Sequence, residues 1–447
     1  MRPTPSTRPH FARSTLAVIL LSVLPGLAVA QSLQELYDAA RAFDATYLAA
    51  KANAQSIEYR AAQSEALTRP SLAATAGAST SQTDLPNTSL KGTTTVSGAL
   101  NGRYPLFNRA NGVTVEQARK LLVSAQADLD AAEQDLILRL AQAYFDVLGA
   151  QDTLATTRAS KAAITEQLAS AKRNFEVGTA TITDTREAQA RFDLATFQEL
   201  AAENDLRTKR VSLDTLVGRS NLVPKPLVVP VVLPAPLPAN AEEWVTAADQ
   251  QHPTVRRARV GLEVAQLETD KARAAALPTV DAVASLGSSD SRGSLPNFSR
   301  SAGTTTVGSV GVQLNWPLYT GGATQNRIKE TLALQDKARN DLEAARRGVA
   351  QGTRVSFFGV QSGLAQVKAL EAAESSSKLA LEATQLGYKV GVRVNLDVLN
   401  AQFQLFTTQR DLAKARYDVL VGGLRLRQAS GQLLPTDVDA LNRLLDK

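Results

Sequence analysis

Hydrophobic and polar residues alternate along four short segments of the chain, which is the pattern of a β-strand with two different faces. The clearest segment runs from Val310 to Leu318, where every second residue is apolar and the residues between are polar or small. The segment from Val96 to Tyr104 has a similar pattern. Leu72–Thr80 and Val280–Ser288 alternate less clearly, because alanine occurs on both faces. We therefore predict two strands in each half of the chain.

Between the strands of each pair, and at their ends, the sequence changes character. Thr83–Gly92 and Ser289–Gly303 are rich in Ser, Asn, Gly and Pro, which predicts exposed loops. A proline disfavours the helical conformation of the residue before it. We therefore expect the chain to switch between helix and strand at four prolines: Pro70, Pro105, Pro278 and Pro317.

Long helices flank the predicted strands. Leu33–Thr68 and its counterpart from about Ala241 to Ala276 are Ala-rich and end before a proline. From Asn111 to Asn174 there is no proline, and a helix of this length would extend about 95 Å. In each half the long helix is followed by a turn and a second helix. In the first half this second helix ends near Gly218. In the second half these helical residues include a 3-4 spacing of apolar positions that is typical of a coiled coil and is interrupted only by Arg410: Leu396, Leu399, Phe403, Phe406, Arg410, Ala413, Tyr417, Leu420 and Leu424.

The order of these segments occurs twice, which indicates a tandem repeat. YPLF from Tyr104 corresponds to WPLY from Trp316, and FEVGTATITD from Phe175 corresponds to YKVGVRVNLD from Tyr388. We assign residues 31–220 to the first repeat and residues 241–447 to the second repeat and C-terminal segment. Residues 221–240 contain six prolines and are expected to form an extended linker.

Composition excludes several kinds of active site. The chain has no cysteine, and its two histidines are His10 and His252. Thiol catalysis, disulfides, cysteine-based zinc sites and iron–sulfur ligation are thereby excluded. His252 has no neighbouring set of ligands, and no glycine-rich phosphate loop occurs. We expect no enzyme activity, no cofactor and no metal.

Residues 1–30 have the pattern of a secretory signal peptide. A basic start precedes an apolar core from Leu16 to Leu24, and Ala28-Val29-Ala30 provides the small residues of a cleavage site. The apolar core is about half the length that a transmembrane helix needs. Removal of the three arginines in this segment lowers the net charge from +6 to +3, which removes the electrostatic argument for binding nucleic acid.

The predicted strands indicate a protein of the outer membrane. About ten alternating residues, bordered by Tyr104, Phe107, Trp316 and Tyr319, fit an outer-membrane strand with an aromatic girdle. Four strands cannot close a barrel, so other copies of the chain must pair with their free edges. Two copies would give eight strands and almost no bore, whereas three copies give a twelve-stranded barrel with a lumen. A homotrimer is the expected assembly. The alternative is a periplasmic coiled-coil adaptor or scaffold that does not enter the membrane.

The duplicated plan, the YPLF and WPLY strand exits and the paired VG turns resemble the TolC family of trimeric outer-membrane channel-tunnels. Asp437–Asn442 is similar to the family's C-terminal DL-x-x-LN stretch. The resemblance implies a mainly α protein, in which a membrane β-barrel with four strands per chain continues into a long periplasmic α-helical barrel. It also implies an outer-membrane exit duct of a Gram-negative bacterium. A periplasmic adaptor and an inner-membrane transporter would deliver proteins (type I secretion) or drugs to it, and the sequence does not decide between these cargoes.

The same resemblance assigns roles to residues near the turns. Asp184 corresponds to an aspartate that accepts a hydrogen bond from a tyrosine, here Tyr388. Arg393 corresponds to an arginine that ties Asp184 and the region of Thr183 of an adjacent protomer. These residues would hold the periplasmic end closed through individually weak bonds, which a partner can break.

A constriction is the second implied feature of this end. Asp397 corresponds to a lumen-facing aspartate that would form a carboxylate ring in a trimer and favour cations. The family pattern has a second aspartate where this chain has Asn400. Gly178 and Gly391 are expected to be turn glycines in the region where the adaptor docks.

Overall fold

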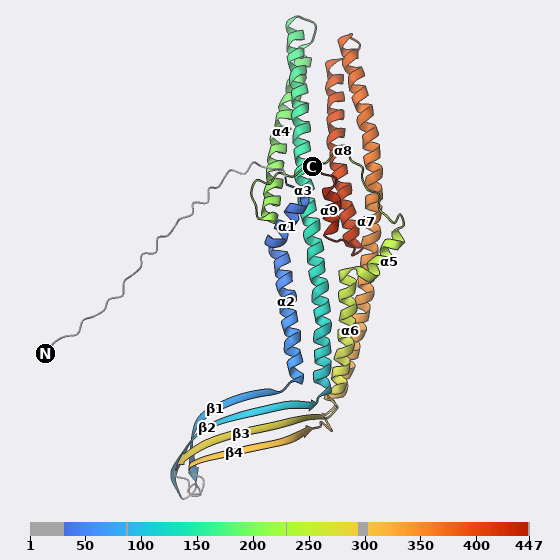
Figure 1. The fold of residues 1–447 in the computed structure, drawn as a ribbon. Helices are drawn as coiled ribbons and strands as arrows, with labels where there is room; N and C mark the ends of the chain where they lie inside the picture. Colours follow the sequence, from blue (N-terminus) through green and yellow to red (C-terminus); the bar gives the residue numbers. More distant parts are fainter. Residues whose placement is uncertain (1–30, 86–87, 229, 294–302, 446–447) are drawn as a thin grey trace, which may run out of the picture.

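The computed structural model describes residues 31–85, 88–228, 230–293 and 303–445. The predicted signal peptide, residues 1–30, lies outside them. A curved four-stranded sheet lies at one end of the molecule, and long helices extend from it to two helical tips at the other end of the molecule (Figure 1). The helices and strands follow one another in the same order twice, with two helices, two strands and two long helices in each half.

The first half contains α1 (Leu33–Phe43), α2 (Ala45–Glu65) and a 3-10 turn, η1 (Ala66–Thr68). These are followed by β1 (Ser71–Leu85), β2 (Thr88–Phe107), α3 (Arg109–Glu176) and α4 (Ile182–Val217). The second half contains α5 (Ala241–Gln251), α6 (Pro253–Ala274), β3 (Thr279–Gly293), β4 (Gly303–Asn315), α7 (Ala323–Lys389) and α8 (Asn395–Ala429). A short helix, α9 (Thr436–Asn442), follows.

Two predicted helices are each broken into two. Asp44 leaves the helical conformation, with ψ at 115°, and its carboxylate accepts a hydrogen bond from the backbone N–H of Tyr47, so it starts α2 where α1 ends. His252 precedes Pro253 and has a ψ of 128°, as expected for a residue before proline. The spacing of apolar residues in the sequence does not reveal such a break, because the helices before and after it both have a buried apolar side.

The sheet is a meander in the order β1-β2-β3-β4, and every neighbouring pair is antiparallel. The predicted loops are too long: β1 extends to Leu85, β2 begins at Thr88, and β3 extends to Gly293. Polar residues stay in the strands there because backbone pairing, as between Gln82 and Gly92, does not depend on side-chain polarity.

The four prolines do not all act as predicted. Pro70 and Pro278 lie directly before β1 and β3, and Pro317 follows the end of β4. Pro105, by contrast, lies within β2 at an irregularity in the pairing with β3, so the switch to helix occurs after Phe107. A proline is compatible with a strand at such a bulge.

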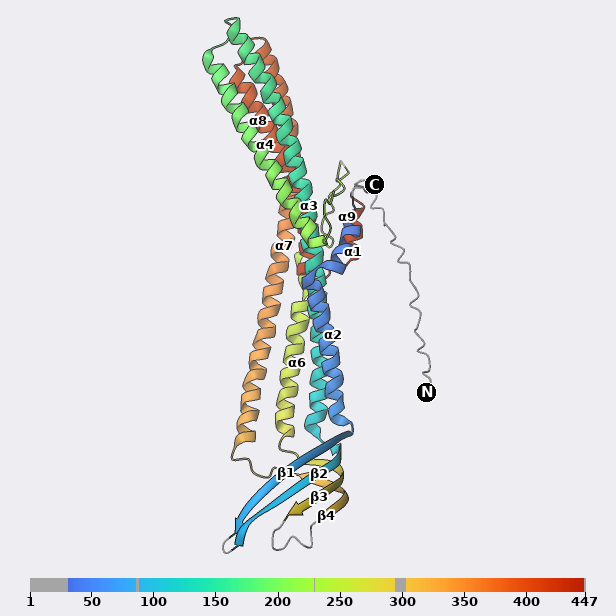
Figure 2. The ribbon, with the colours of Figure 1, turned by 90° about the vertical axis from the view of Figure 1, so that its left-hand side faces the viewer.

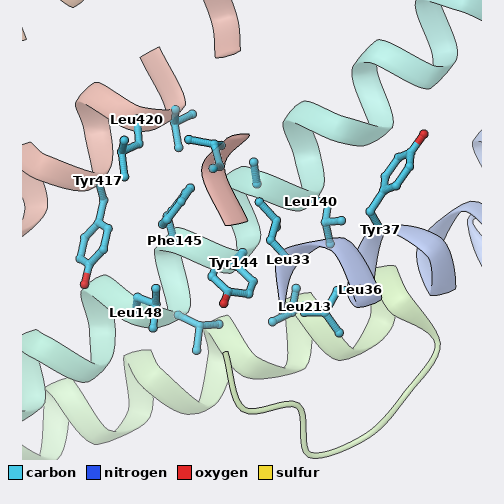
Figure 3. Close-up of a cluster of buried hydrophobic side chains, with 14 of the residues drawn as sticks. Leu33, Leu36, Tyr37, Leu140, Tyr144, Phe145, Leu148, Leu213, Tyr417 and Leu420 are labelled. Atoms are coloured by element: carbon cyan, nitrogen blue, oxygen red, sulfur yellow. The ribbon is translucent and has the colours of Figure 1, made fainter. Parts of the chain in front are cut away.

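Near the sheet, α2, α3, α6 and α7 lie side by side (Figure 2). Toward the tips, α3 continues beside α4 and α7 continues beside α8, so that two helical hairpins form. The main hydrophobic core lies between these two regions. There, side chains of α1, α3, α4, α8 and α9 meet, including Leu36, Tyr144, Leu213 and Tyr417 (Figure 3). Residues 218–228 and 230–240 form no helix, and Leu227 pairs with Leu445 in a short β-bridge.

Candidate functional site

Over the part nearer the helices, the sheet has one mainly apolar and one mainly polar face. Strand register places Leu72 of β1, Gly102 of β2, Ala284 of β3 and Val310 of β4 in one row, so their side chains share a face. Neighbouring rows on that face, the apolar face, contribute these further residues: Ala74, Ala76, Ala78, Val96, Leu100, Tyr104, Ala282, Leu286, Val312 and Leu314. Val310 is 89% exposed and Leu72 is 76% exposed in the protomer. The apolar face is therefore a large hydrophobic surface that the protomer itself leaves uncovered.

The opposite, polar face carries hydroxyl, amide and charged side chains from the same strands: Ser71, Thr75, Ser97, Asn101, Arg103, Asp281, Ser285, Ser309 and Gln313. Arg103 Nη2 donates to Asp281 Oδ2 at 2.7 Å, which joins β2 to β3 close to the helices. Ser285 and Ser309 share a hydrogen bond of 2.8 Å between β3 and β4. Such a face suits water, and the apolar face suits lipid.

Both outer strands of the sheet have one unpaired edge in the protomer. Among the described residues, β1 is bonded to β2 alone and β4 to β3 alone, so each has a row of backbone donors and acceptors without a strand partner. Exposed edges of this length lead to pairing with another chain.

The two helical tips have the same turn geometry. Gly178 ends α3 with a φ of 78°, and Gly391 ends α7 with a φ of 79°. In each turn the last carbonyls of the helix accept backbone N–H groups, including Thr179 N to Asn174 O at 2.8 Å and Val392 N to Gly387 O at 2.9 Å. The glycines are required there because other residues rarely adopt a positive φ.

Asp184 caps the start of α4. Its carboxylate accepts hydrogen bonds from Thr181 N at 2.9 Å and Thr181 Oγ1 at 2.7 Å, and Thr181 Oγ1 accepts from Asp184 N in return. Thr183, beside it, is exposed. Within the protomer no hydrogen bond joins Asp184 to Tyr388 in the described residues. The Tyr388 hydroxyl instead accepts a bond of 3.1 Å from Asn174 Nδ2.

Arg393 and Asp397 lie together, with Arg393 Nη1 3.6 Å from Asp397 Oδ2, one helical turn apart. Asn400 Oδ1 accepts a hydrogen bond of 3.0 Å from Arg191 Nη2 of α4. Gln167 of α3 donates to Asn395 of α8. The bonds of Arg191 and Gln167 connect the tip of one hairpin to that of the other.

Sequence reasoning missed the donors Asn174, Gln167 and Arg191. Each lies more than 200 residues from its acceptor, so no local spacing identifies it. Only the packing of α3 and α4 against α7 and α8 brings the pairs together.

A hydrogen bond at the root of the hairpins fixes α8 to α3. The Tyr417 hydroxyl donates to Asp152 Oδ2 at 2.6 Å, and the Tyr417 ring stacks on Phe145 at 5.7 Å between centroids. Burial raises the pKa of the Asp152 carboxyl, while the bond from Tyr417 opposes that rise. Burial likewise raises the pKa of Tyr417, which keeps the hydroxyl protonated as a donor.

His252 and Trp244 have structural contacts in the protomer. His252 Nδ1 accepts a hydrogen bond from Thr254 N and so caps α6, and burial lowers the pKa of its imidazole, which keeps it neutral. Trp244 Nε1 donates to the carbonyl of Pro238 at 2.8 Å, and Trp316 is exposed after β4. In the described part of the chain no three Asp, Glu or His side chains form a group that could hold a metal ion. Over the same residues, none of the helices combines the length and apolarity needed to cross a membrane.

Comparison with known proteins gives a consistent result. Residues 36–219 and 244–432 match the protein family described as outer membrane efflux protein. The chain is 33% identical over 431 residues to the outer membrane protein TolC of Vibrio cholerae, covering 94% of this chain and 95% of that protein. It is 28% identical to the proteases secretion protein PrtF of Dickeya chrysanthemi, over 95% of this chain and 94% of the relative.

The fold resembles that of a solved outer membrane protein. The crystal structure of the outer membrane protein VceC from Vibrio cholerae superposes with a TM-score of 0.75 at 21% identity, covering 89% of this chain and 96% of VceC. Both matched stretches of the family lie in the parts of the chain that form the two sets of helices and strands. The chain therefore belongs to the outer membrane efflux protein family.

Proposed function

We propose that the protein is the outer-membrane exit duct of a tripartite export system and works as a homotrimer. The observation that carries the proposal is the sheet, which has one apolar and one polar face and two free edges and lies at the end of helices as long as α3. At 1.5 Å per residue, the 68 residues of α3 extend about 100 Å. The sheet fits a membrane and the helices reach far into the periplasm.

Pairing of β4 with β1 of the next copy would continue the alternation of strand direction, because β1 and β4 run in opposite directions. Three copies would then form a closed barrel of twelve strands, with the apolar face toward lipid and the polar face toward a lumen. Two copies would form eight strands, and their side chains would fill the interior.

Exposed apolar residues on the long helices support association of the same copies. Phe197 and Leu200 on α4 are 66% and 62% exposed, and Val355 and Phe358 on α7 are 64% and 56% exposed. Large apolar side chains that are exposed on a helix surface are typical of a protein–protein interface. We infer that the hairpins of neighbouring protomers pack there, which would close the helices into a periplasmic barrel.

Phe403 of α8 adds to these exposed apolar residues. It is 49% exposed, whereas Leu399, Tyr417, Leu420 and Leu424 of the same predicted seam are buried within the protomer. Most of the seam is therefore used inside the protomer, and Phe403 is left for a neighbour.

For the tip we propose a gate. Asp184, Thr183, Tyr388 and Arg393 would form bonds within and between protomers that hold it closed, and Asp397 would line the constriction. Their contacts in the protomer are exposed and polar, and such bonds contribute about 0–1 kcal/mol each. A partner that binds the tip can therefore open it.

The partners would be a periplasmic adaptor and an inner-membrane transporter, with the adaptor docking at the turns of Gly178 and Gly391. Val177 and Val392 in these turns are 73% and 77% exposed, which offers an apolar contact. A relative named for protease secretion favours protein as cargo, and drugs are the second candidate. Residues 31–220 and 241–447 would be repeats of one ancestral unit, joined by the linker 221–240.

Reconstitution and fractionation test the duct. Mature protein in a planar bilayer should give discrete conductance steps, and cells should retain it in the outer-membrane fraction as a detergent-soluble oligomer. Release by osmotic shock, with no conductance, would instead identify the periplasmic adaptor or scaffold. Cysteines introduced as Thr179→Cys or Val392→Cys should crosslink to the adaptor, whereas Lys51→Cys on the exposed surface of α2 should not.

A further inference from the structure

Arg191 brings a positive charge to the face of α8 on which the constriction is proposed. Asn400 follows Asp397 by three residues, so the two side chains lie on the same side of α8, one turn apart. Arg191 Nη2 donates to Asn400 Oδ1 at 3.0 Å from α4. The guanidinium therefore lies beside the turn of α8 that carries Asp397.

Arg191 has no ion-pair partner among the described residues. Asp397 is already paired with Arg393, at 3.6 Å. Among the described residues, no carboxylate oxygen lies within 4.0 Å of an Arg191 nitrogen, and Asn400 has no charge. Asp184 is occupied at the start of α4, where its carboxylate compensates the positive helix end. Arg191, Arg393 and Asp397 together thus leave one positive charge per protomer.

A purely structural role would not need this charge. A hydrogen bond to the neutral Asn400 amide needs a donor but no charge on it. Arginine keeps its charge at every accessible pH, so three copies in a trimer would form a permanent ring of three positive charges. In a narrow aqueous passage, such a ring attracts anions and repels cations.

We propose that Arg191 determines the ionic selectivity of this constriction, by adding a positive charge beside the Arg393–Asp397 pair so that anions pass at least as readily as cations. This inference rests on the proposed trimeric duct and on Asp397 lining its narrowest part. The substrates it favours at the tip are small inorganic anions and cargo with acidic segments.

Reversal potentials across a planar bilayer with a KCl gradient around 0.1 M test the proposal. The wild-type ratio of K⁺ to Cl⁻ permeability should lie within about twofold of unity. Arg191→Gln, which keeps a donor for Asn400 and removes the charge, should raise the ratio about threefold. Arg191→Lys should leave it near the wild-type value. Arg207→Gln, on the exposed surface of α4 far from the tip, is the control and should have no effect.

Measurements at high salt distinguish an effect of the Arg191 charge from a structural effect of the substitution. At 1 M KCl the screening length falls to about 3 Å, so the effect of Arg191→Gln should nearly disappear. The proposal is wrong if the wild type strongly prefers cations and Arg191→Gln leaves that preference unchanged. It is also wrong if Arg191→Lys behaves like Arg191→Gln, or if the effect persists at 1 M KCl. Absence of conductance from the wild type would refute the duct itself, which is a separate result.

Discussion

Tyr417→Phe removes one hydroxyl from the root of the α7/α8 hairpin and leaves the ring in place. That hydroxyl donates to Asp152 Oδ2 of α3 at 2.6 Å. The ring still stacks on Phe145, with an interplanar angle of 28°, and still covers Gly149, whose position would place a Cβ 3.6 Å from the ring. The substitution therefore isolates one hydrogen bond between the two halves of the chain.

The expected loss follows from the partner's charge and burial. A hydrogen bond to an ionised group contributes about 1.5–3 kcal/mol, and Asp152 would lose its only side-chain donor among the described residues. With an unfolding entropy of about 2.1 cal/mol/K per residue, a chain of this length would melt about 2–3 °C lower. The oligomer should still assemble, because the apolar contacts of the core are kept.

The pH dependence gives a sharper test. Burial raises the folded-state pKa of Asp152, so the stability linked to this group is complete below the unfolded pKa and is lost as pH rises through the folded pKa. Without the Tyr417 hydroxyl, which lowers that pKa, the loss at neutral pH is larger. The melting difference between wild type and variant should therefore be full at pH 7.5 and should shrink at pH 4.

Melting in detergent by intrinsic fluorescence measures this difference. Tyr59→Phe is the matched control, because Tyr59 is 69% exposed on α2. An equal melting temperature for wild type and Tyr417→Phe at pH 7.5 would refute the reasoning, as would a difference that does not change with pH.

Three further predictions concern other parts of the chain. Asp44→Ala removes the cap of α2 and the Arg139 partner at 3.0 Å, and should cost about 2–4 kcal/mol at pH 7 in denaturant unfolding. Because Arg139 lowers the pKa of Asp44, this contribution exists above the unfolded pKa and should vanish as pH falls through the folded pKa. Gln402→Leu should raise the melting temperature by about 1 °C, since Gln402 Oε1 is buried without a hydrogen-bond partner; a lower value would contradict this. Tyr388→Phe combined with Arg393→Ser should raise single-channel conductance, and unchanged conductance would exclude these residues from the gate.

Local signals predicted most elements of the fold. Alternation identified the four strands, and the absence of proline identified the long helix that became α3. The turn glycines Gly178 and Gly391 were evident because they lie between two helical patterns, and both have a positive φ. Such features depend only on residues that are close together in the sequence, so they can be predicted without knowing the fold.

Features that depend on distant residues were not predictable. The break at Asp44 is fixed partly by Arg139, which lies 95 residues away. Strands extended into the polar segments because each was paired by its neighbour, and the donors to Tyr388 and Asn400 come from the other half of the chain. The resemblance to relatives assigned Asp184 and Tyr388 to one another, whereas within the protomer each has a different partner.

In the proposed duct, three copies close the barrel by pairing β4 with β1 of the next copy. The chain has no cysteine, so a pair can be introduced on a clean background: Thr75→Cys on β1, combined in turn with Val307→Cys, Ser309→Cys or Gly311→Cys on β4. Within a protomer these strands are three spacings apart, about 14 Å, which a short bismaleimide of about 8 Å does not span. Treatment of outer membranes should give crosslinked dimers and trimers in denaturing gels, ending at the trimer. Crosslinking that ends at the dimer, continues beyond the trimer or does not occur at any of the three positions would contradict the account.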